Sequence, residues 1–291
     1  MRWIISRVGL GLTLGILLSL LVACTGSQQE AATSVPPLNL QFVTTSTNMT
    51  LQENRLVVTL WRGGDYYAEV ESLQVRAHDP NQPQHPVVWE GPATAYPDYA
   101  IPYWVAYPEV SAPGLWRFGL TVKTTHGQTV EGSLLVQVRA DDAGVQVGMP
   151  APPSQTLALS TTELPLYQIS SDAAPLPALY SQSVAEALVS GRPSLITFAT
   201  PGLCTNRICT PVLDSTIKPI AERYGELLNV LHVEVYDLQT SQYVPAMAEW
   251  GLSYEPWTYL VDGQGRVWAR FDGPVSVLEL TPALEALLAE G

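Results

Sequence analysis

The stretch "FATPGLCTNRICTPVLD" (198–214) carries two of the three cysteines of the chain, Cys204 and Cys209, between two segments of different pattern. The residues at 192–200 include a short apolar run that predicts a buried strand. The residues at 211–228 have apolar side chains at helical spacing and predict a helix. A cysteine at the start of a helix lies near unpaired backbone N–H groups, which lower the pKa of its thiol. The pair is therefore a candidate redox couple, structural disulfide or metal site.

The segments around this stretch alternate between helix and strand patterns. Helices are predicted at 183–191, 241–251 and 281–291, and strands at 229–237, 256–262 and 266–273. In the last helix we expect Thr281 as the N-cap and Pro282 as the first helical residue. This order of elements predicts an α/β sandwich.

The N-terminal half has a different pattern, made of short segments rich in Val, Leu, Thr and aromatic residues. Strands are predicted at 38–45, 55–61, 68–77, 86–90, 115–124 and 130–140. In the last two, Trp116, Phe118, Leu120 and Val122 alternate along one face of a hairpin. The spacing predicts an antiparallel β-sandwich over 38–140. The motif "PGLWRF" resembles a strand of bacterial immunoglobulin-like accessory domains, which implies an immunoglobulin-like sandwich.

Aromatic residues and prolines are concentrated in the segment 94–116. Exposed tyrosines and tryptophans would form a docking surface for a partner or a glycan. We favour the alternative, in which this segment is a long loop whose aromatic side chains fold back onto the core.

The first 23 residues have a basic start and a long uncharged apolar run, as expected for a signal peptide. The run ends in "LVAC" (21–24), which resembles the lipobox of bacterial lipoproteins and implies that Cys24 is acylated. Residues 24–37 are polar and predict a flexible tether. The implied location is the extracytoplasmic face of the cell membrane, held by the lipid on Cys24. An ordinary signal peptide or an uncleaved anchor, with Cys24 incidental, is the alternative.

The charge balance restricts the partners of the chain. It has 14 Lys and Arg against 27 Asp and Glu, a formal net charge of −13. Removal of the signal peptide takes Arg2 and Arg7, which leaves 12 basic against 27 acidic residues and a charge of −15. This acidity disfavours nucleic acids and anionic lipid headgroups as partners. With 46% hydrophobic residues, the chain can form about two domains, which we place at 38–140 and 176–291, with 141–175 as linker and entry segment.

The C-terminal half resembles the thioredoxin-like fold, on several motifs together. These are the order of its elements, the "FATP" after the first long strand, the cysteines before the helix, and a proline ahead of the hairpin. The motifs "VGMPAP" (147–152) and "EPWTYLVDGQGRVWARFDGP" (255–274) are similar to segments of membrane-anchored thioredoxin-like oxidoreductases. The resemblance begins near Gly148 and extends to the end of the chain.

The resemblance implies roles for four residues. Cys204 matches the nucleophilic cysteine and Cys209 the resolving partner. Pro256 matches the cis-proline that contacts a substrate chain, and Glu255 precedes it at the same surface. The implied activity is thiol–disulfide exchange with the thiols or disulfides of exported proteins, and it requires no bound cofactor.

The chain departs from the family pattern at the same site. Four residues separate the cysteines where exchange enzymes of the family have two. Leu203 replaces the usual tryptophan, and Thr197 stands where a buried acid often relays protons. If Glu255 points at the cysteines, its negative charge raises their pKa, whereas Arg207 between them has the opposite effect.

Two other interpretations stay open. In the first, Cys204 and Cys209 form a permanent disulfide in a redox-inactive interaction or assembly lipoprotein. In the second, they bind copper for delivery, as in assembly factors that also use a distal histidine. His232 is the one histidine of this half, and we expect it to be a buried, hydrogen-bonded side chain, so no metal site is predicted.

Overall fold

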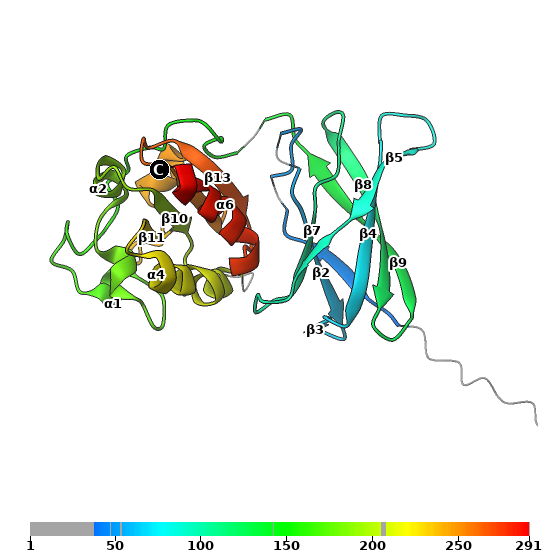
Figure 1. Cartoon of the computed structure of the whole chain (residues 1–291), viewed down its shortest axis with the longest axis horizontal. Coiled ribbons are helices and arrows are strands. Elements are labelled where there is room, and N and C mark those ends of the chain that lie inside the picture. Colours follow the sequence, from blue (N-terminus) through cyan, green and yellow to red (C-terminus); the bar gives the residue numbers. More distant parts are fainter. Residues whose placement is uncertain (1–37, 47, 53, 142, 205–207, 291) are drawn as a thin grey trace, which may run out of the picture. The chain divides into compact units, whose positions relative to one another are not determined.

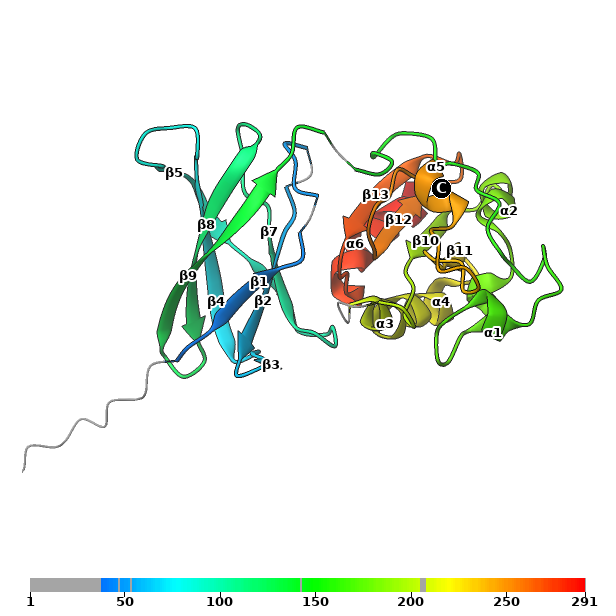
Figure 2. The ribbon, with the colours of Figure 1, turned by 180° about the vertical axis from the view of Figure 1, so that it is seen from behind.

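Two antiparallel β-sheets form the N-terminal part of the chain (Figures 1 and 2). The computed structural model describes residues 38–46, 48–52, 54–141, 143–204 and 208–290. The first sheet has the order β1 (Gln41–Thr44), β2 (Leu56–Arg62), β7 (Tyr103–Ala106) and β6 (Thr94–Tyr96), and β3 (Asp65–Tyr66) also pairs with β2. The second has the order β5 (Val87–Pro92), β4 (Val70–His78), β8 (Gly114–Thr124) and β9 (Thr129–Val138). Buried side chains of both sheets share one core, so the sheets pack face to face.

The hairpin of β8 and β9 has the side-chain alternation that the sequence predicted. Trp116, Phe118, Leu120 and Val122 are all fully buried. Leu115, which lies between them on the other face, is 52% exposed. Because successive side chains of a strand point to opposite faces, one face of this hairpin fills the core and the other faces solvent.

A four-stranded mixed sheet forms the centre of the C-terminal part (Figures 1 and 2). Its order is β11 (Asn229–Val233), β10 (Ser194–Phe198), β12 (Trp257–Val261) and β13 (Val267–Asp272). β10 is parallel to β11 and antiparallel to β12, which is antiparallel to β13. The helical segments are α1 (Leu166–Ile169), η1 (Pro177–Tyr180), α2 (Val184–Val189), α3 (Cys209–Val212), η2 (Leu213–Ile217), α4 (Lys218–Tyr224), α5 (Pro245–Glu249) and α6 (Val277–Glu290).

Helices cover both faces of this sheet. Leu195 of β10 shares a core cluster with Ile220 of α4 and Leu284 of α6. Its neighbours Ile196 and Phe198 belong to another cluster, with side chains of α2 and α5. The alternation along β10 therefore places α4 and α6 on one face and α2 and α5 on the other.

The helical run that follows the cysteines is continuous from Cys209 to Tyr224, but its middle is widened. In η2, a π-helical stretch, the Lys218 N–H donates to the carbonyl of Leu213, five residues earlier. Pro219 comes next and has no N–H to donate, which removes one regular bond of an α-helix. We attribute the widened turn to this proline.

The C-terminal helix begins earlier than the sequence predicted. α6 starts at Val277 and contains Pro282 in its interior, so Thr281 is not the N-cap. Instead Ser276 Oγ accepts a hydrogen bond from the Glu279 N–H at 3.1 Å, as an N-cap side chain does. The prediction was wrong because a serine cap and the turn that follows it can form ahead of a proline, whose missing N–H removes a single helical bond.

Most rings of the aromatic segment 94–116 point inward, as favoured from the sequence, although Tyr107 is 51% exposed. The expectation of a long loop was wrong, because the segment contains the strands β6 and β7, which pair with each other. Trp104 lies in the core between the two N-terminal sheets. Tyr99 and Tyr103 belong to the core cluster that contains α4 and α6. The residues from Leu38 onward accordingly form one compact unit.

A buried arginine joins the N-terminal sheets to the C-terminal part. Arg55 is 5% exposed, and its guanidinium donates two hydrogen bonds of 2.7 Å to the carboxylate of Glu279 on α6. It donates two more, also at 2.7 Å, to the carbonyls of Asp272 and Pro274. Tyr103 donates its hydroxyl to the same Glu279 carboxylate. Burial raises the pKa of Tyr103, which keeps that hydroxyl protonated. Both oxygens of the buried Glu279 carboxylate therefore accept hydrogen bonds from this cluster.

Candidate functional site

A disulfide joins Cys204 and Cys209 in the segment between β10 and the helical run, with their Cα atoms 6.1 Å apart. Cys209 is completely buried and is the first residue of α3. Cys204 is half-buried and lies in the preceding turn. The residues 205–207, and with them Arg207, lie outside the described part of the chain. The pairing expected from the cysteine count is therefore present, with one sulfur nearer to solvent than the other.

The four-residue spacing changes which cysteine lies at the helix terminus. Cys209 occupies it, so the backbone N–H groups and the helix dipole act on the predicted resolving cysteine. Cys204, the predicted nucleophile, lies off the helix. The helix terminus therefore acts on Cys209 and not on Cys204, because the four-residue loop places Cys204 before the helix.

Glu255 points at the disulfide. One of its carboxylate oxygens and the Sγ atoms of Cys204 and Cys209 all lie within 4.8 Å of one another. The carboxylate accepts a hydrogen bond from the Thr200 N–H. The peptide bond from Glu255 to Pro256 is cis, as the sequence predicted. The structure thus brings together all four residues that were predicted for this site.

The pKa of Glu255 lies near neutrality. Burial raises it to about 7, and the negative charge of Glu234 acts in the same direction. The bond from the Thr200 N–H acts against both, since it stabilises the ionised form. Near neutral pH, Glu255 can therefore either hold a proton beside the sulfurs or carry a negative charge there.

A second buried acid, Glu234, was missed from the sequence. It follows β11, is 8% exposed, and accepts hydrogen bonds from the Ser171 N–H at 2.6 Å and from the Ser171 hydroxyl. Ser170 Oγ lies 3.2 Å from the same carboxylate. Burial raises its pKa to about 7 despite these donors. The available signal was an acid inside the apolar run "VLHVEVYD" (230–237).

Thr200 lies between the two acids. Its N–H donates to Glu255, and its side chain takes part in a hydrogen bond with Glu234. The Thr200 hydroxyl oxygen also accepts from the N–H of Val235 at 2.7 Å and of Tyr236 at 3.2 Å. A hydrogen-bonded connection therefore extends from Glu255, beside the disulfide, through Thr200 to Glu234.

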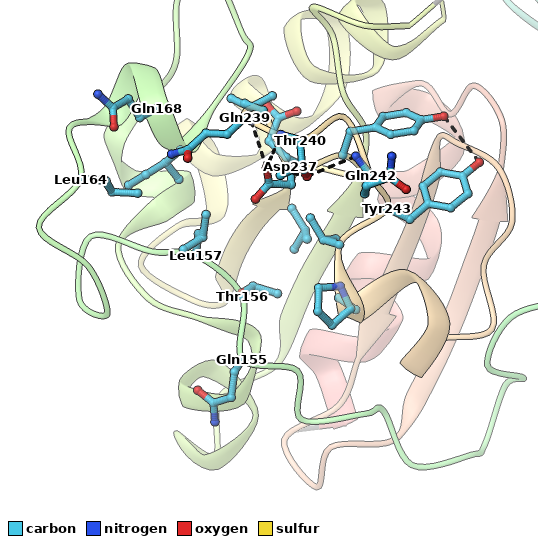
Figure 3. Close-up of a pocket in the computed structure, with 18 of the residues that line it drawn as sticks. Gln155, Thr156, Leu157, Leu164, Gln168, Asp237, Gln239, Thr240, Gln242 and Tyr243 are labelled. Atoms are coloured by element: carbon cyan, nitrogen blue, oxygen red, sulfur yellow. Dashed lines mark hydrogen bonds between the residues drawn. The ribbon is translucent and has the colours of Figure 1, made fainter.

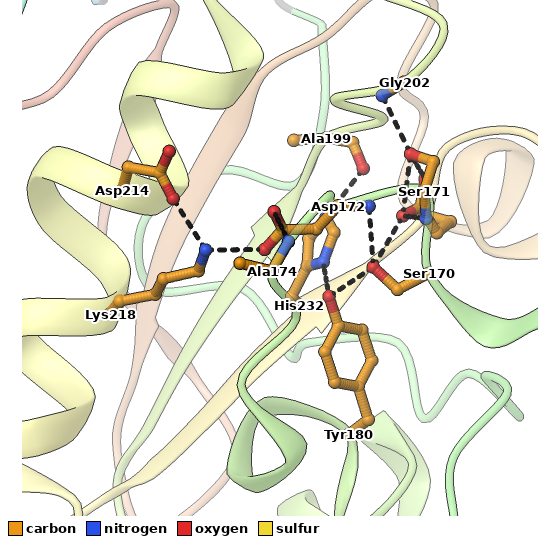
Figure 4. Close-up of polar contacts among 11 residues, drawn as sticks. Ser170, Ser171, Asp172, Ala174, Tyr180, Ala199, Gly202, Asp214, Lys218 and His232 are labelled. Carbon is orange, nitrogen blue, oxygen red and sulfur yellow. Dashed lines mark hydrogen bonds and ion pairs between the residues drawn. The ribbon is translucent and has the colours of Figure 1, made fainter. Parts of the chain in front are cut away.

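His232 is buried and fully hydrogen-bonded, as predicted (Figure 4). Its Nε2 lies 2.8 Å from the Ala199 carbonyl, which can only accept, so the proton is on Nε2. Its Nδ1 therefore accepts from the Tyr180 hydroxyl, which also bonds with Ser170. Burial lowers the pKa of His232 to about 4, so the ring is neutral at physiological pH.

The turn that carries Cys204 is held by the segment before η1 (Figure 4). The Gly202 N–H donates to the Ser171 hydroxyl at 3.0 Å. A Cβ at Gly202 would lie 2.8 Å from that of Ser171, so only glycine fits here. The next residue, Asp172, forms an ion pair with Lys218 at 2.7 Å, and Lys218 pairs with Asp214 at 2.6 Å. The same short segment thus contacts the cysteine turn, Glu234 and the helical run.

The possibility of a metal site depends on the redox state. Reduced Cys204 and Cys209 together with Glu255 could offer three ligand atoms to an ion. The disulfide-bonded pair offers no thiolate, and both ring nitrogens of His232 are engaged with Tyr180 and Ala199. The histidine that the copper interpretation needs is therefore already used within the fold.

A cavity of about 480 Å³ is lined in part by His232 and Glu234. The loop around Asp237 forms one of its walls (Figure 3). Tyr236 and Tyr243 stack on this wall with ring centroids 4.9 Å apart. The Asp237 carboxylate accepts hydrogen bonds from Gln239 and Thr240 of its own loop, which fixes the loop shape. Of the two acids, Glu234 thus lines this cavity and Glu255 does not.

The predicted lipidation site, Cys24, lies outside the described residues, as do the signal peptide and the whole tether. Among the helices that the structure describes, none is long and apolar enough to cross a membrane.

Comparison with known proteins gives distant structural matches and no sequence match. No family model and no curated protein matches the chain. A thiol:disulfide interchange protein of the thioredoxin family from Chlorobium tepidum matches at 14% identity and a TM-score of 0.32, over 51% of this chain and 99% of that one. CopC from Methylosinus trichosporium matches at 15% identity and a TM-score of 0.27, over 36% of this chain and 97% of that one. A lipoprotein from Bacteroides thetaiotaomicron matches at 12% identity and a TM-score of 0.21, over 36% of this chain and 84% of that one.

Proposed function

We propose that this chain is a lipid-anchored, extracytoplasmic protein that exchanges disulfides with exported proteins through Cys204 and Cys209. The proposal assigns an immunoglobulin-like sandwich to 38–140 and a thioredoxin-like domain to 176–291. The observation that carries it is the asymmetry of the disulfide, in which a half-buried sulfur is joined to a fully buried one beside Glu255 and a cis-proline. An incoming sulfur reaches Cys204 more easily, and Cys209 is left as the internal partner.

The exchange proceeds in two steps. A substrate thiolate attacks Cys204 Sγ, the bond to Cys209 Sγ breaks, and its electron pair leaves on Cys209 as a thiolate. A second substrate thiolate then attacks the substrate sulfur of the mixed disulfide and releases Cys204 as a thiolate. The substrate dithiol becomes a disulfide, and the protein takes up two electrons. In the opposite direction, Cys204 attacks a substrate disulfide and Cys209 resolves the intermediate.

Glu255 supplies or accepts a proton during these steps. As a neutral acid it can protonate the sulfur that leaves as a thiolate, and as an anion it can take the proton back when the thiol must react. A carboxyl with a pKa of about 7 does both near neutral pH. Its negative charge also raises the pKa of a nearby thiol, so thiolate formation is easiest when Glu255 is protonated. Glu255, held by Thr200, thereby takes the role of the buried acid that related enzymes have at the position of Thr197.

The proposal is tested by the reduction potential of the pair. The full-length protein in detergent is equilibrated with glutathione or dithiothreitol mixtures, and free thiols are trapped with a maleimide. We expect a potential between about −120 and −270 mV, the range of exchange catalysts. A value below about −300 mV is typical of a structural disulfide and would contradict the proposal in favour of a redox-inactive interaction protein.

Trapping distinguishes the two cysteines. Cys209→Ser should accumulate mixed disulfides with exported proteins through Cys204, because no resolving thiol remains. Cys204→Ser is the matched control, and it should trap far less because Cys209 is buried. If neither variant traps partners and both only lose stability, the pair is a structural link.

A further inference from the structure

A cavity of about 350 Å³ lies between the N-terminal sheet and the loop that carries the cis-proline. Val43 of β1 and Trp61 of β2 line it from one side. Glu255 and Pro256 line it from the other. The buried bonds from Arg55 to the chain around β13 and α6 hold these two sides together.

This cavity adjoins the disulfide. The Glu255 carboxylate in its wall lies within 4.8 Å of the sulfurs of both cysteines. Ile208, which directly precedes Cys209, also lines the cavity, and its carbonyl accepts a 3.2 Å hydrogen bond from the Tyr99 hydroxyl. A polypeptide that places its sulfur on Cys204 can therefore reach this cavity with a neighbouring residue.

The walls favour uncharged, apolar groups. Trp61 packs against Tyr66 with ring centroids 4.2 Å apart, and its Nε1 donates to the Thr59 hydroxyl at 3.0 Å, which fixes the indole. Among the described residues that line the cavity, Glu255 is the only acid and no side chain is basic. An anionic group would therefore meet Glu255 without a compensating cation, in a chain whose net charge is −13.

We propose that this cavity binds an uncharged aromatic or branched aliphatic side chain next to the reactive cysteine of a polypeptide substrate. The inference rests on the proposed function, and it makes the N-terminal sandwich a part of substrate selection. Aromatic walls bind such side chains by burial of apolar surface and by ring contacts. Acidic residues at the same substrate position are rejected by Glu255.

The test uses short disulfide-linked peptides that differ in the residue beside the cysteine. The reduced full-length protein in detergent is mixed with peptides carrying Phe, Leu, Gly or Asp at that position, and the second-order rate of its oxidation is measured. We expect the Phe and Leu peptides to react about tenfold faster than the Gly peptide, and the Asp peptide to react more slowly than it.

The wall is tested with Trp61→Ala, for which the ratio of the Phe rate to the Gly rate should fall toward one. Trp89→Ala is the matched control, since Trp89 is a partly buried tryptophan of β5 in the other sheet. This variant should keep the rate ratio of the unmodified protein. A ratio of one in the unmodified protein overturns the inference. So does an equal ratio in the two variants.

A binding measurement separates this inference from the exchange proposal. Peptides with Ser in place of Cys cannot react, and their affinity is measured by calorimetry or tryptophan fluorescence. The Phe peptide should bind about tenfold more tightly than the Gly peptide, and Trp61→Ala should remove the difference. Equal affinities overturn the cavity assignment even where exchange is observed. A difference in affinity without any exchange supports the cavity and contradicts the catalytic proposal.

Discussion

Glu279 on one side, and Glu234 and Glu255 on the other, are held in opposite surroundings. Glu279 lies between the N-terminal sheets and α6, where the Arg55 guanidinium pairs with both of its oxygens. Glu234 and Glu255 lie beside the disulfide, where their donors are backbone N–H groups and hydroxyls. Of the ion pairs among the described residues, none includes Glu234 or Glu255.

The difference shows what each acid is suited to do. A carboxylate paired with a buried guanidinium keeps its charge and fixes two parts of a chain against each other. A carboxyl buried without a cation has its pKa raised, here to about 7 for both Glu234 and Glu255. The first arrangement is structural, whereas the second provides a proton at neutral pH.

The largest effect is expected at the paired acid. Arg55→Met removes the cation and leaves the Glu279 charge buried, which should lower the free energy of unfolding by about 3–5 kcal/mol. Denaturant titration measures this loss. Arg62→Met, at the exposed end of β2, the strand that begins directly after Arg55, should leave stability nearly unchanged. The double variant Arg55→Met, Glu279→Leu should recover much of the loss, and its failure to do so would argue against the buried charge as the cause.

A smaller, pH-dependent effect is expected at Glu234. Its pKa is raised from 4.5 to about 7 on folding, so the folded state holds the proton more tightly. The stabilisation it gives is complete below about pH 4.5 and is lost as the pH rises through about 7. Glu234→Gln cannot ionise, so it should gain on the order of 1–3 kcal/mol over the unmodified protein at about pH 8 and nothing at about pH 4.

The stability of Glu226→Gln, an exposed substitution, is the reference for this comparison. A Glu234→Gln variant that is less stable than this reference at both pH values would show that its hydrogen bonds outweigh its titration.

The smallest effect is expected at Glu255, on reactivity. Above about pH 7 its charge raises the pKa of the neighbouring thiols, with Glu234 and Tyr236 as the other titrating groups nearby. Glu255→Gln should therefore make the reduced Cys204 react up to about tenfold faster with iodoacetamide at about pH 8, and should remove an inflection near pH 7. Glu90→Gln, exposed on β5, should keep the inflection. An unchanged pH profile of the alkylation rate in Glu255→Gln would mean that the charge of Glu255 does not affect the pKa of the thiols.

The sequence predicted the elements well where a periodic pattern meets a clear boundary. The β8–β9 hairpin and the strands of the C-terminal sheet fall where alternation and apolar runs placed them. The start of α6 was wrong, because Ser276 and Thr281 are both acceptable caps and the deciding contact comes from the fold around Ser276. Local pattern alone cannot choose between two such residues.

The site was predictable in part. The four residues of the site come together because β10 and β12 are antiparallel neighbours. Cys204 and Cys209 follow the end of β10, and Glu255 and Pro256 directly precede the start of β12 at the same edge of the sheet. Glu234 and Thr200 were not found, because their importance depends on burial and on which hydroxyls face them. The role of Tyr99 and Tyr103 was predicted in part. Their inward packing was expected from the sequence, but their contact with the core around α4 and α6 was not.

The contact made by Arg55 also bears on how this protein can be divided. A C-terminal fragment cut in the segment near residue 143 would retain Glu279 without its cation and would expose the apolar surface that Tyr99 and Tyr103 cover. Such a fragment carries every residue of the disulfide site and yet lacks part of its own core. The two halves are therefore interdependent in folding, and the intact chain should unfold in a single cooperative transition.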